Sequence, residues 1–354
     1  MRLAAAALLL VAVLAGCGGA GGSRDARTLP PGSVSLPGLP AQGLVVPRGH
    51  GVVLVGLDGR FVARLPRFAS YPSGDTTHDE VMHDLDWAGQ LEQPRLVTAG
   101  DRYYRLDASR HALIPVPGPR VPLAGGADLV GHGHVEADGS IVFRGLSVVR
   151  GGHVLVRRDV NATVVAGMFV QSRGRLLDLR TGTSWALPPR CIGAGVRGDA
   201  AYAFCATGPP YRYGRGGVDP YPHTWLERVT DLHGAAKVAE FQRAGPFARI
   251  TAALSPNGRF VAEQGEPACG GGFLFVGPTD GSLNARLVSG DEWTSRSPFS
   301  TFIGWSADGR VVAHIQWGEN CEQPSKEGVY LVDPRTLKRT LVTRDAGWMW
   351  NAFP

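Results

Sequence analysis

The sequence has little lysine and no cluster of positive charge. Only three of its 36 basic residues are lysines, and its arginines are interspersed with 31 acidic residues along the whole chain. The formal charge of +5 therefore comes without the basic stripe that nucleic-acid binding requires. We expect no nucleic-acid partner, although this charge is compatible with a weak attraction to anionic lipid or wall polymer.

Catalytic sequence motifs are also lacking. The chain contains no G-x-S-x-G nucleophile elbow and no P-loop. Gly193–Gly198 matches G-x-G-x-x-G, but a dinucleotide site needs a helix after the glycines, and the residues that follow have the pattern of a strand. His78 and His83 are spaced too widely for a zincin helix, and His132 and His134 have no third ligand nearby. We expect no catalytic residue, no metal and no cofactor.

No apolar run reaches the roughly 20 residues that a membrane span needs. The longest run, Leu3–Leu14, follows Arg2 and has the length of a signal-peptide core. It ends in Leu14-Ala15-Gly16-Cys17, which resembles the lipobox of bacterial lipoproteins. The resemblance implies cleavage before Cys17 and acylation of this cysteine, which would anchor the chain to the outer face of the cytoplasmic membrane. Cleavage without lipidation, as in other secreted proteins, is the alternative.

Composition divides the rest of the chain into two parts. Residues 18–42 are rich in glycine and proline, so we expect a flexible or extended tether there. No second linker of this kind interrupts residues 43–354, which we therefore interpret as one domain. With the signal peptide at residues 1–17, this accounts for the whole sequence.

Turn residues, by contrast, are abundant. The 49 glycines and 26 prolines help to separate short runs of strand-forming residues, and only the signal has the character of a helix. Ser255–Ala262 recurs as Ser306–Ala313, 51 residues later. A period of about 40–50 residues built on strand-turn-strand units is typical of β-propeller blades. The sequence therefore predicts an all-β propeller.

Regularly spaced hairpins indicate how many blades there are. Seven outer hairpins are expected at Val52–Leu65, Tyr103–Val116, Ser147–Arg157, Arg175–Leu187, Trp225–Phe241, Phe273–Val288 and Val329–Val342. Inner hairpins are expected at Ala127–Arg144, Cys191–Cys205, Ala248–Glu263 and Thr301–Trp317. We predict seven four-stranded blades, with six as the alternative because residues 145–188 are crowded. The C-terminal strand Gly347–Phe353 is expected to complete the first blade and close the ring.

The repeat itself resembles a known family. Trp305-Ser306-Ala307-Asp308-Gly309-Arg310, followed by Val311-Val312-Ala313, is similar to the repeat of TolB-like propellers. Residues 254–262 match it with Leu254 in place of tryptophan and Asn257 in place of aspartate. The resemblance implies a propeller that binds other proteins of the cell envelope, and it specifies no partner. TolB also has a separate N-terminal α/β domain, for which we expect no room in this sequence.

Four cysteines remain after the lipobox cysteine, which favours disulfides in an exported protein. Cys191 and Cys205 lie almost symmetrically about the turn at residues 198–199, so they are expected to face each other across a hairpin. Cys269 and Cys321 follow the two repeats at offsets of 14 and 15 residues, so they are expected to join neighbouring blades. A metal site of four cysteines is the alternative, but it lacks any C-x₂-C spacing.

The expected binding face carries the long loops. In a propeller, the connections between the second and third strands of a blade share one face with the connections between blades. The longest of these are residues 206–224, 264–272 and 318–328, joined by the inter-blade loops at 67–83 and 289–300. The candidate binding residues are Tyr211, Arg212, Tyr213, Arg215, Tyr221, His223, Trp293 and Trp317. Tyrosine, arginine and tryptophan are enriched in binding hot spots, although these side chains could instead pack only within their loops.

These patterns favour a function in binding. We expect a monomeric, lipid-anchored propeller without catalysis, which binds a protein or glycan of the envelope. The alternative is a glycan lyase or glycoside hydrolase whose carboxylates converge on the binding face. Its candidate acids are Asp79, Glu80, Asp219, Glu266, Asp291 and Glu319. A third interpretation is a partner in the assembly or sensing of a membrane complex.

Overall fold

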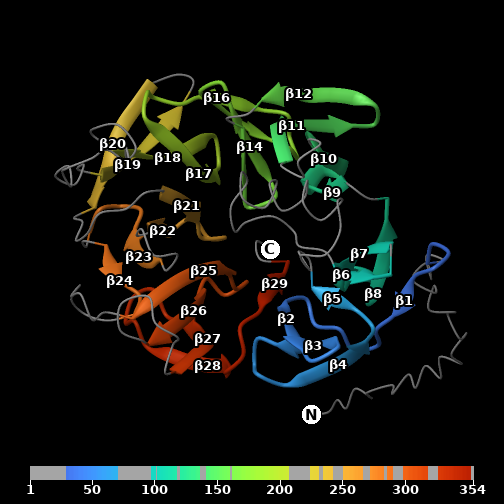
Figure 1. Cartoon of the computed structure of the whole chain (residues 1–354). Helices are drawn as coiled ribbons and strands as arrows, with labels where there is room; N and C mark the ends of the chain where they lie inside the picture. The colour runs from blue at the N-terminus through green and yellow to red at the C-terminus, as the bar shows by residue number, and fades with distance from the viewer. Residues whose placement is uncertain are drawn as a thin grey trace, which may run out of the picture.

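The computed structural model arranges the chain as a ring of seven antiparallel sheets (Figure 1). It describes residues 29–70, 97–100, 102–117, 120–135, 141–159, 162–206, 224–230, 234–241, 250–265, 272–282, 285–289, 298–317 and 326–351. Within these ranges there is no α-helix, and helical structure is limited to the 3₁₀ turns Ala108–Arg110 and Ala124–Gly126. The described residues therefore include no helix long and apolar enough to cross a membrane. The prediction of a seven-bladed β-propeller is confirmed.

Each blade has four strands, which follow one another from the centre of the ring outward. Blade one is β29 (Trp348–Trp350), β2 (Gly43–Arg48), β3 (Gly51–Gly56) and β4 (Phe61–Pro66). Blade two is β5 (Ala69–Ser70), β6 (Val97–Ala99), β7 (Arg102–Asp107) and β8 (Ala112–Val116), with β1 (Val34–Ser35) added outside β8. Blade three is β9 (Arg120–Pro122), β10 (Ala127–Val135), β11 (Ile141–Arg150) and β12 (His153–Asp159).

The remaining four blades follow the same order. Blade four is β13 (Thr163–Val165), β14 (Phe169–Ser172), β15 (Arg175–Asp178) and β16 (Ser184–Ala186). Blade five is β17 (Cys191–Arg197), β18 (Ala200–Ala206), β19 (Thr224–Thr230) and β20 (Gly234–Phe241). Blade six is β21 (Ile250–Leu254), β22 (Phe260–Gly265), β23 (Phe273–Pro278) and β24 (Arg286–Leu287). Blade seven is β25 (Phe299–Trp305), β26 (Val311–Trp317), β27 (Lys326–Val332) and β28 (Arg339–Thr343).

The ring closes as predicted, through the last strand of the chain. β29 pairs with β2, so the first blade combines the two ends of the propeller. The buried Gln42 reinforces this closure: its Nε2 donates to the carbonyl oxygens of Trp305 (3.0 Å) and Asn351 (2.8 Å). Its Oε1 accepts from the backbone N–H of Ala307 at 2.7 Å. The side chain of Gln42, which immediately precedes β2, thus connects blade seven with the residue that follows β29.

The repeated Ser-x-Asn/Asp-Gly-Arg segment forms similar turns in blades six and seven, and the turn of blade six is one residue longer. The hydroxyl of Ser255 donates to Asn257 Oδ1 (2.9 Å) and accepts the backbone N–H of Phe260 (3.0 Å). Ser306 likewise donates to Asp308 Oδ1 and accepts the N–H of Arg310. The glycines of the two turns have φ of 65° and 80°, a backbone conformation that glycine adopts readily. The repeat in the sequence is thus a repeat of turn chemistry.

Two parts of the inner-strand prediction are wrong. Ala127–Arg144 was expected to form the inner pair of its blade, but β10 and β11 are the middle pair, because β9 pairs with the inner side of β10. In blade four the inner pair is β13–β14, around a turn at residues 166–168 that the sequence did not single out. β9 and β13 have only three residues each, too few for a recognisable strand pattern.

Residues 29–42 pack against the propeller, which differs from the flexible tether expected there. β1 pairs with β8 through Val34 and Ser35, so this segment covers the outer edge of blade two. Leu36 and Leu39 are 5% and 1% exposed and belong to the hydrophobic cluster between blades one and two. Burial of these two leucines favours the packed conformation over an extended, solvated one.

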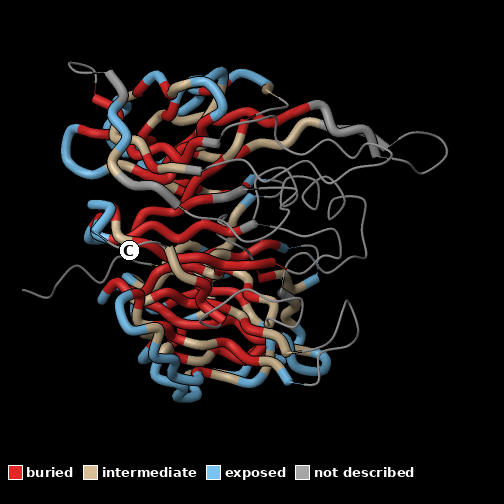
Figure 2. Tube along the Cα trace, turned by 90° about the vertical axis from the view of Figure 1, so that its left-hand side faces the viewer, coloured by how far each residue is buried: buried red, intermediate tan, exposed pale blue. Residues whose placement is uncertain are grey.

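The core lies between neighbouring blades. Trp305 of β25 is fully buried between blades six and seven, and its Nε1 donates to the carbonyl oxygen of Ala253 at 3.2 Å. Similar apolar clusters join the other blades. Figure 2 shows the ring from the side, with buried strand segments through its middle and exposed turns along its left-hand side. We call this turn-bearing side, at residues 57–60, 198–199, 256–259 and 307–310, the lower face. The opposite side, where second strands end and third strands begin, is the upper face.

Candidate functional site

Most of the residues selected from the sequence lie outside the described residues. Among the candidate binding residues these are Tyr211, Arg212, Tyr213, Arg215, Tyr221, His223 and Trp293. The same holds for Cys17, Cys269, Cys321, His78 and His83, and for the acids Asp79, Glu80, Asp219, Glu266, Asp291 and Glu319. The lipid anchor, the second disulfide and the enzymatic alternative therefore stay predictions. Trp317, Cys191 and Cys205 are described, and they lie at the upper face.

The inter-blade connection is shorter than the expected loop at residues 67–83, of which residues 71–83 lie outside the described residues. Only Arg67 and Phe68 separate β4 from β5, so the inter-blade connection is two residues long. Residues 71–96 follow β5 and precede β6, and β5 pairs with β6 through Ala69–Thr98 and Ser70–Val97. The open ends of this pair are at the lower face, because first strands run away from the upper face.

Trp317 is part of a compact cluster at the upper end of blade seven. It is the last residue of β26 and is paired with Lys326, the first residue of β27. The Lys326 Nζ lies 5.1 Å from the centroid of the indole ring, and the ring of Tyr330 meets it edge-on at 5.7 Å. The tryptophan is half-buried and the lysine is exposed. The cluster therefore presents a cation and an aromatic ring together at the upper face, held by cation–π and edge-to-face contacts.

A polar group lies on the other side of the same two strands. His314 Nε2 is 3.1 Å from Glu327 Oε2, and the side-chain amide of Gln316 donates to the same oxygen at 3.3 Å. Burial lowers the pKa of His314, because the charged imidazolium loses hydration, and the opposing attraction of Glu327 does not compensate. The imidazole is therefore neutral in the folded protein at neutral pH.

The lowered pKa of His314 predicts that acid destabilises the protein. In the unfolded chain this histidine takes up a proton at a higher pH than in the folded chain. The contribution of His314 to the free energy of unfolding is therefore fully present above the pKa that this histidine has in the unfolded chain. It is lost as the pH falls through that value toward the lower pKa of the folded protein. We expect the urea midpoint of wild type to fall between pH 7.5 and pH 5.5, and His314→Gln to reduce this fall. An unchanged pH dependence in the variant would show that other groups cause it.

The disulfide between Cys191 and Cys205 lies near the upper end of blade five, consistent with the pairing expected from the sequence. Both cysteines are buried. Trp225 is paired with Cys205, and its Nε1 donates to Glu227 Oε1 at 2.6 Å. The two sulfurs and the Glu227 carboxylate lie within 4.8 Å of one another. Because the sulfurs are bonded to each other, they offer no thiolate to a metal.

Sequence reasoning missed Trp225, Lys326 and Tyr330. Trp225 is the second residue of β19, the third strand of blade five, and Trp317 is the last residue of β26, the second strand of blade seven, so both lie beside the connection between the second and third strands of their blades. Both tryptophans are half-buried. The position of an aromatic residue at a strand end is visible in the sequence. The residue that faces it on the neighbouring strand cannot be identified from the sequence, because that residue depends on the register of the two strands.

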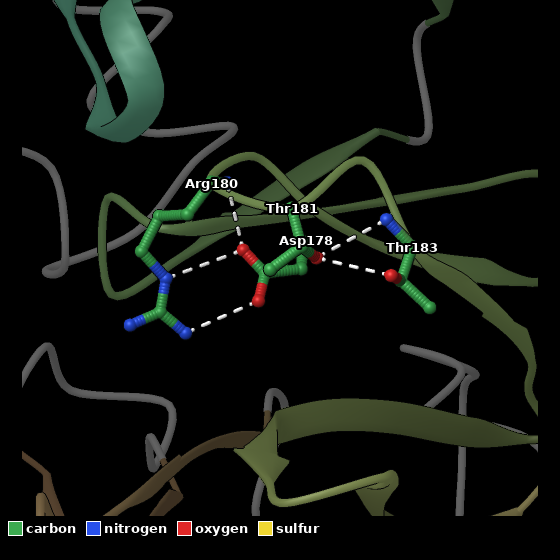
Figure 3. Close-up of polar contacts among 4 residues, drawn as sticks. All are labelled: Asp178, Arg180, Thr181 and Thr183. Carbon is green, nitrogen blue, oxygen red and sulfur yellow. Dashed lines mark hydrogen bonds and ion pairs between the residues drawn. The ribbon is translucent and has the colours of Figure 1, made fainter.

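A buried carboxylate at the lower face stabilises a turn. Asp178 is 2% exposed and accepts from Arg180 through its backbone N–H (2.8 Å), Nε (3.3 Å) and Nη2 (3.1 Å), as Figure 3 shows. Beside it, the Thr181 hydroxyl oxygen accepts from the backbone N–H of Thr183. The guanidinium also lies 5.5 Å from the ring centroid of Phe169. The guanidinium of Arg180 neutralises the charge of the Asp178 carboxylate, so we interpret this ion pair as stabilising the turn between β15 and β16.

His132 and Ser147 form a second polar pair, in blade three. The His132 Nε2 and Ser147 Oγ are 2.7 Å apart, and the same hydroxyl accepts the backbone N–H of Arg158 at 2.9 Å. Burial, and then the positive charge of Arg158, lower the pKa of His132. Because Ser147 is 7% exposed and holds the backbone of β12, we interpret the pair as fixing that strand.

Comparison with known proteins relates the chain to other propellers. No protein-family model and no curated protein sequence matches it. Among solved structures it is similar to TolB from Agrobacterium tumefaciens, with 14% identity and a TM-score of 0.31, covering 83% of this chain and 94% of that one. TolB from Acinetobacter baumannii has 12% identity and a TM-score of 0.33, with 87% and 80% covered.

An enzyme is among the similar structures as well. Oligopeptidase B from Leishmania major has 11% identity and a TM-score of 0.44, covering 87% of this chain and 49% of the peptidase. The chain thus spans about half the length of that enzyme. At these identities and TM-scores the comparisons carry no argument about function. The assignment of a seven-bladed propeller rests on the sheet topology itself.

Proposed function

We propose that this protein is a lipid-anchored, non-catalytic β-propeller that binds a protein or glycan of the cell envelope through its upper face. The cluster of Trp317, Lys326 and Tyr330 carries the proposal. Aromatic and cationic side chains that are already held in place lose little entropy on binding, and tryptophan and tyrosine are enriched among residues that dominate binding energy. Trp225 extends the same chemistry to blade five.

Two features of the sequence support the rest of the proposal. Leu14-Ala15-Gly16-Cys17 is the basis for the anchor, through acylation of Cys17. The tyrosines and arginines of residues 207–223 follow directly after β18, whose Cys205 is tied to Cys191. The disulfide holds two strands together at the point where this segment begins.

Site-specific photo-cross-linking in the producing cell tests the binding face. We replace Lys326 at the upper face with a photoreactive phenylalanine derivative, and Lys338 in a matched control. Both lysines are exposed on blade seven, and Lys338 follows the β27–β28 turn of the lower face. We expect a defined adduct from position 326, at least about five-fold weaker when Trp317→Ala is added, since loss of a hot-spot tryptophan costs about 1 kcal/mol or more.

The control position decides how the result is interpreted. Equal adducts from positions 326 and 338, or an adduct at 326 that Trp317→Ala leaves unchanged, would contradict binding through the upper face. A discrete adduct band identifies a protein partner, and a ladder of bands identifies a glycan. Thermal unfolding of the Trp317→Ala variant must match wild type within a few degrees for the comparison to count.

A further inference from the structure

The outermost strand of blade three has an unusual shape. Among the described residues no strand pairs with the outer side of β12, which lies at the periphery of the ring (Figure 1). Its pairing with β11 is interrupted twice: Val149 pairs with Val154 and Val148 with Val156, and Leu146 pairs with Asp159. Leu155 is therefore an extra residue on β12 with no counterpart on β11. Farther along, residues 157 and 158 of β12 together oppose the single residue Ser147 of β11. Each interruption is a β-bulge, which re-aims the side chains of the bulged strand.

The first bulge leaves two consecutive apolar side chains in solvent. Val154 is 52% exposed and Leu155 is 37% exposed. In a regular strand, consecutive side chains point to opposite faces and one of them turns toward the core. Phe61 and Leu341 are the other large apolar side chains exposed in the described part of the chain, and they lie singly on other blades. Within the described ranges, blade three alone has two consecutive large apolar side chains that are exposed.

The second bulge places positive charge beside this pair. Arg157 and Arg158 are both exposed, as is His153 at the start of the strand. Ser147 fixes the bulge by accepting the backbone N–H of Arg158. The acid at the end of the strand, Asp159, is half-buried and accepts a hydrogen bond from the hydroxyl of Ser172. The exposed surface of β12 is therefore apolar and cationic.

Edge protection explains only part of this pattern. Bulges and charged side chains on an edge strand prevent pairing with another chain, so the two arginines fit a protective role. An exposed valine–leucine pair does the opposite, since it adds apolar surface to an open edge. Apolar side chains flanked by arginine are the combination that enters the headgroup region of an anionic bilayer.

We propose that the β12 edge of blade three docks on the surface of an anionic phospholipid bilayer. Val154 and Leu155 enter the interface, and Arg157 and Arg158 contact the lipid phosphates. The N-terminal segment supports this orientation, because β1 lies on the outer edge of blade two, the next blade in the ring. Cys17 precedes β1 by 17 residues, so the anchor proposed above would pull this side of the ring toward the membrane. Only that supporting point rests on the proposed function.

Vesicle sedimentation tests the surface without the anchor. The chain from residue 18 onward contains every residue of the propeller and lacks the lipidation site. We expect it to bind vesicles of equal phosphatidylglycerol and phosphatidylcholine more tightly than vesicles of phosphatidylcholine alone. Val154→Ser with Leu155→Ser should weaken this binding at least about five-fold. Arg157→Gln with Arg158→Gln should weaken it by roughly five-fold per arginine and reduce its sensitivity to salt.

Matched substitutions elsewhere on the rim control for general stickiness. Phe61→Ser and Leu341→Ser remove similarly exposed apolar side chains from blades one and seven, and they should leave vesicle binding unchanged. Absence of binding to the anionic vesicles, or equal effects of all these substitutions, would overturn the proposal. So would a dimer in vesicle-free sedimentation that Val154→Ser with Leu155→Ser abolishes, because the patch would then join two copies of the chain. The test is independent of cross-linking at Lys326, so either proposal can fail alone.

Discussion

A chain that ends at Gly347 is expected to lose the folded propeller. This truncation removes β29, whose Trp348, Met349 and Trp350 are 6%, 4% and 3% exposed. Burial of a large apolar side chain contributes about 1.5–3 kcal/mol, so the three together contribute roughly 5–9 kcal/mol. A whole domain is stable by only about 5–15 kcal/mol. The truncation also leaves β2 as an open inner edge. We expect loss of the cooperative thermal transition in circular dichroism and rapid digestion by protease.

The matched control for this prediction ends at Asn351. That chain keeps β29 and the backbone carbonyl of Asn351, which accepts from the side chain of Gln42. It should unfold cooperatively, within a few degrees of the full chain. A Gly347 truncation that kept the full cooperative transition would show that the remaining six blades and the three strands of blade one are stable without closure.

Trp305→Ala is expected to have the largest effect of any single substitution in the described core. The indole is fully buried between blades six and seven, meets Phe302 edge-on at 6.0 Å and donates to the carbonyl of Ala253. Replacing a buried aromatic residue by alanine costs about 3–5 kcal/mol. We expect the urea midpoint to fall accordingly, and protease sensitivity to increase at the boundary between blades six and seven.

Two further variants separate the causes of this effect. Trp305→Phe keeps most of the apolar volume but loses the indole N–H, so it should cost less than the alanine variant. Phe61→Ala removes an aromatic side chain that is 67% exposed, and a surface change of this kind shifts stability by about 0.5 kcal/mol or less. A Trp305→Ala midpoint close to that of Phe61→Ala would contradict the role assigned to the inter-blade core.

The sequence was most informative where structure depends on neighbouring residues. The turns at Asn257-Gly258 and Asp308-Gly309 form through serine, asparagine or aspartate and glycine within five residues of chain. Such turns are specified locally, which is why these two inner hairpins could be predicted, as could the outer hairpins, whose turns are local as well. The disulfide of blade five followed from the same reasoning, because Cys191 and Cys205 flank one tight turn.

The candidate site was less predictable, because its contacts are not local. Trp317 was identified from its place at a strand end, but Lys326 and Tyr330 become its neighbours only through the register of β26 and β27. The β12 surface was not anticipated either. Predicting a strand from its sequence pattern assumes that successive side chains alternate strictly between the two faces of the sheet. A bulge breaks this alternation, and in β12 the hydroxyl of Ser147 accepts the backbone N–H of Arg158 within the bulge.

By itself the sequence determined the all-β class, the seven repeated hairpins and the closing role of the last strand, because turn chemistry and hydrophobic period are properties of short segments. Only the tertiary structure decided which strands are innermost, that residues 29–42 pack against blades one and two, and which side chains reach solvent together at Trp317 and along β12. Those outcomes depend on pairing between segments far apart in the chain, and on apolar area that is buried only once the blades meet.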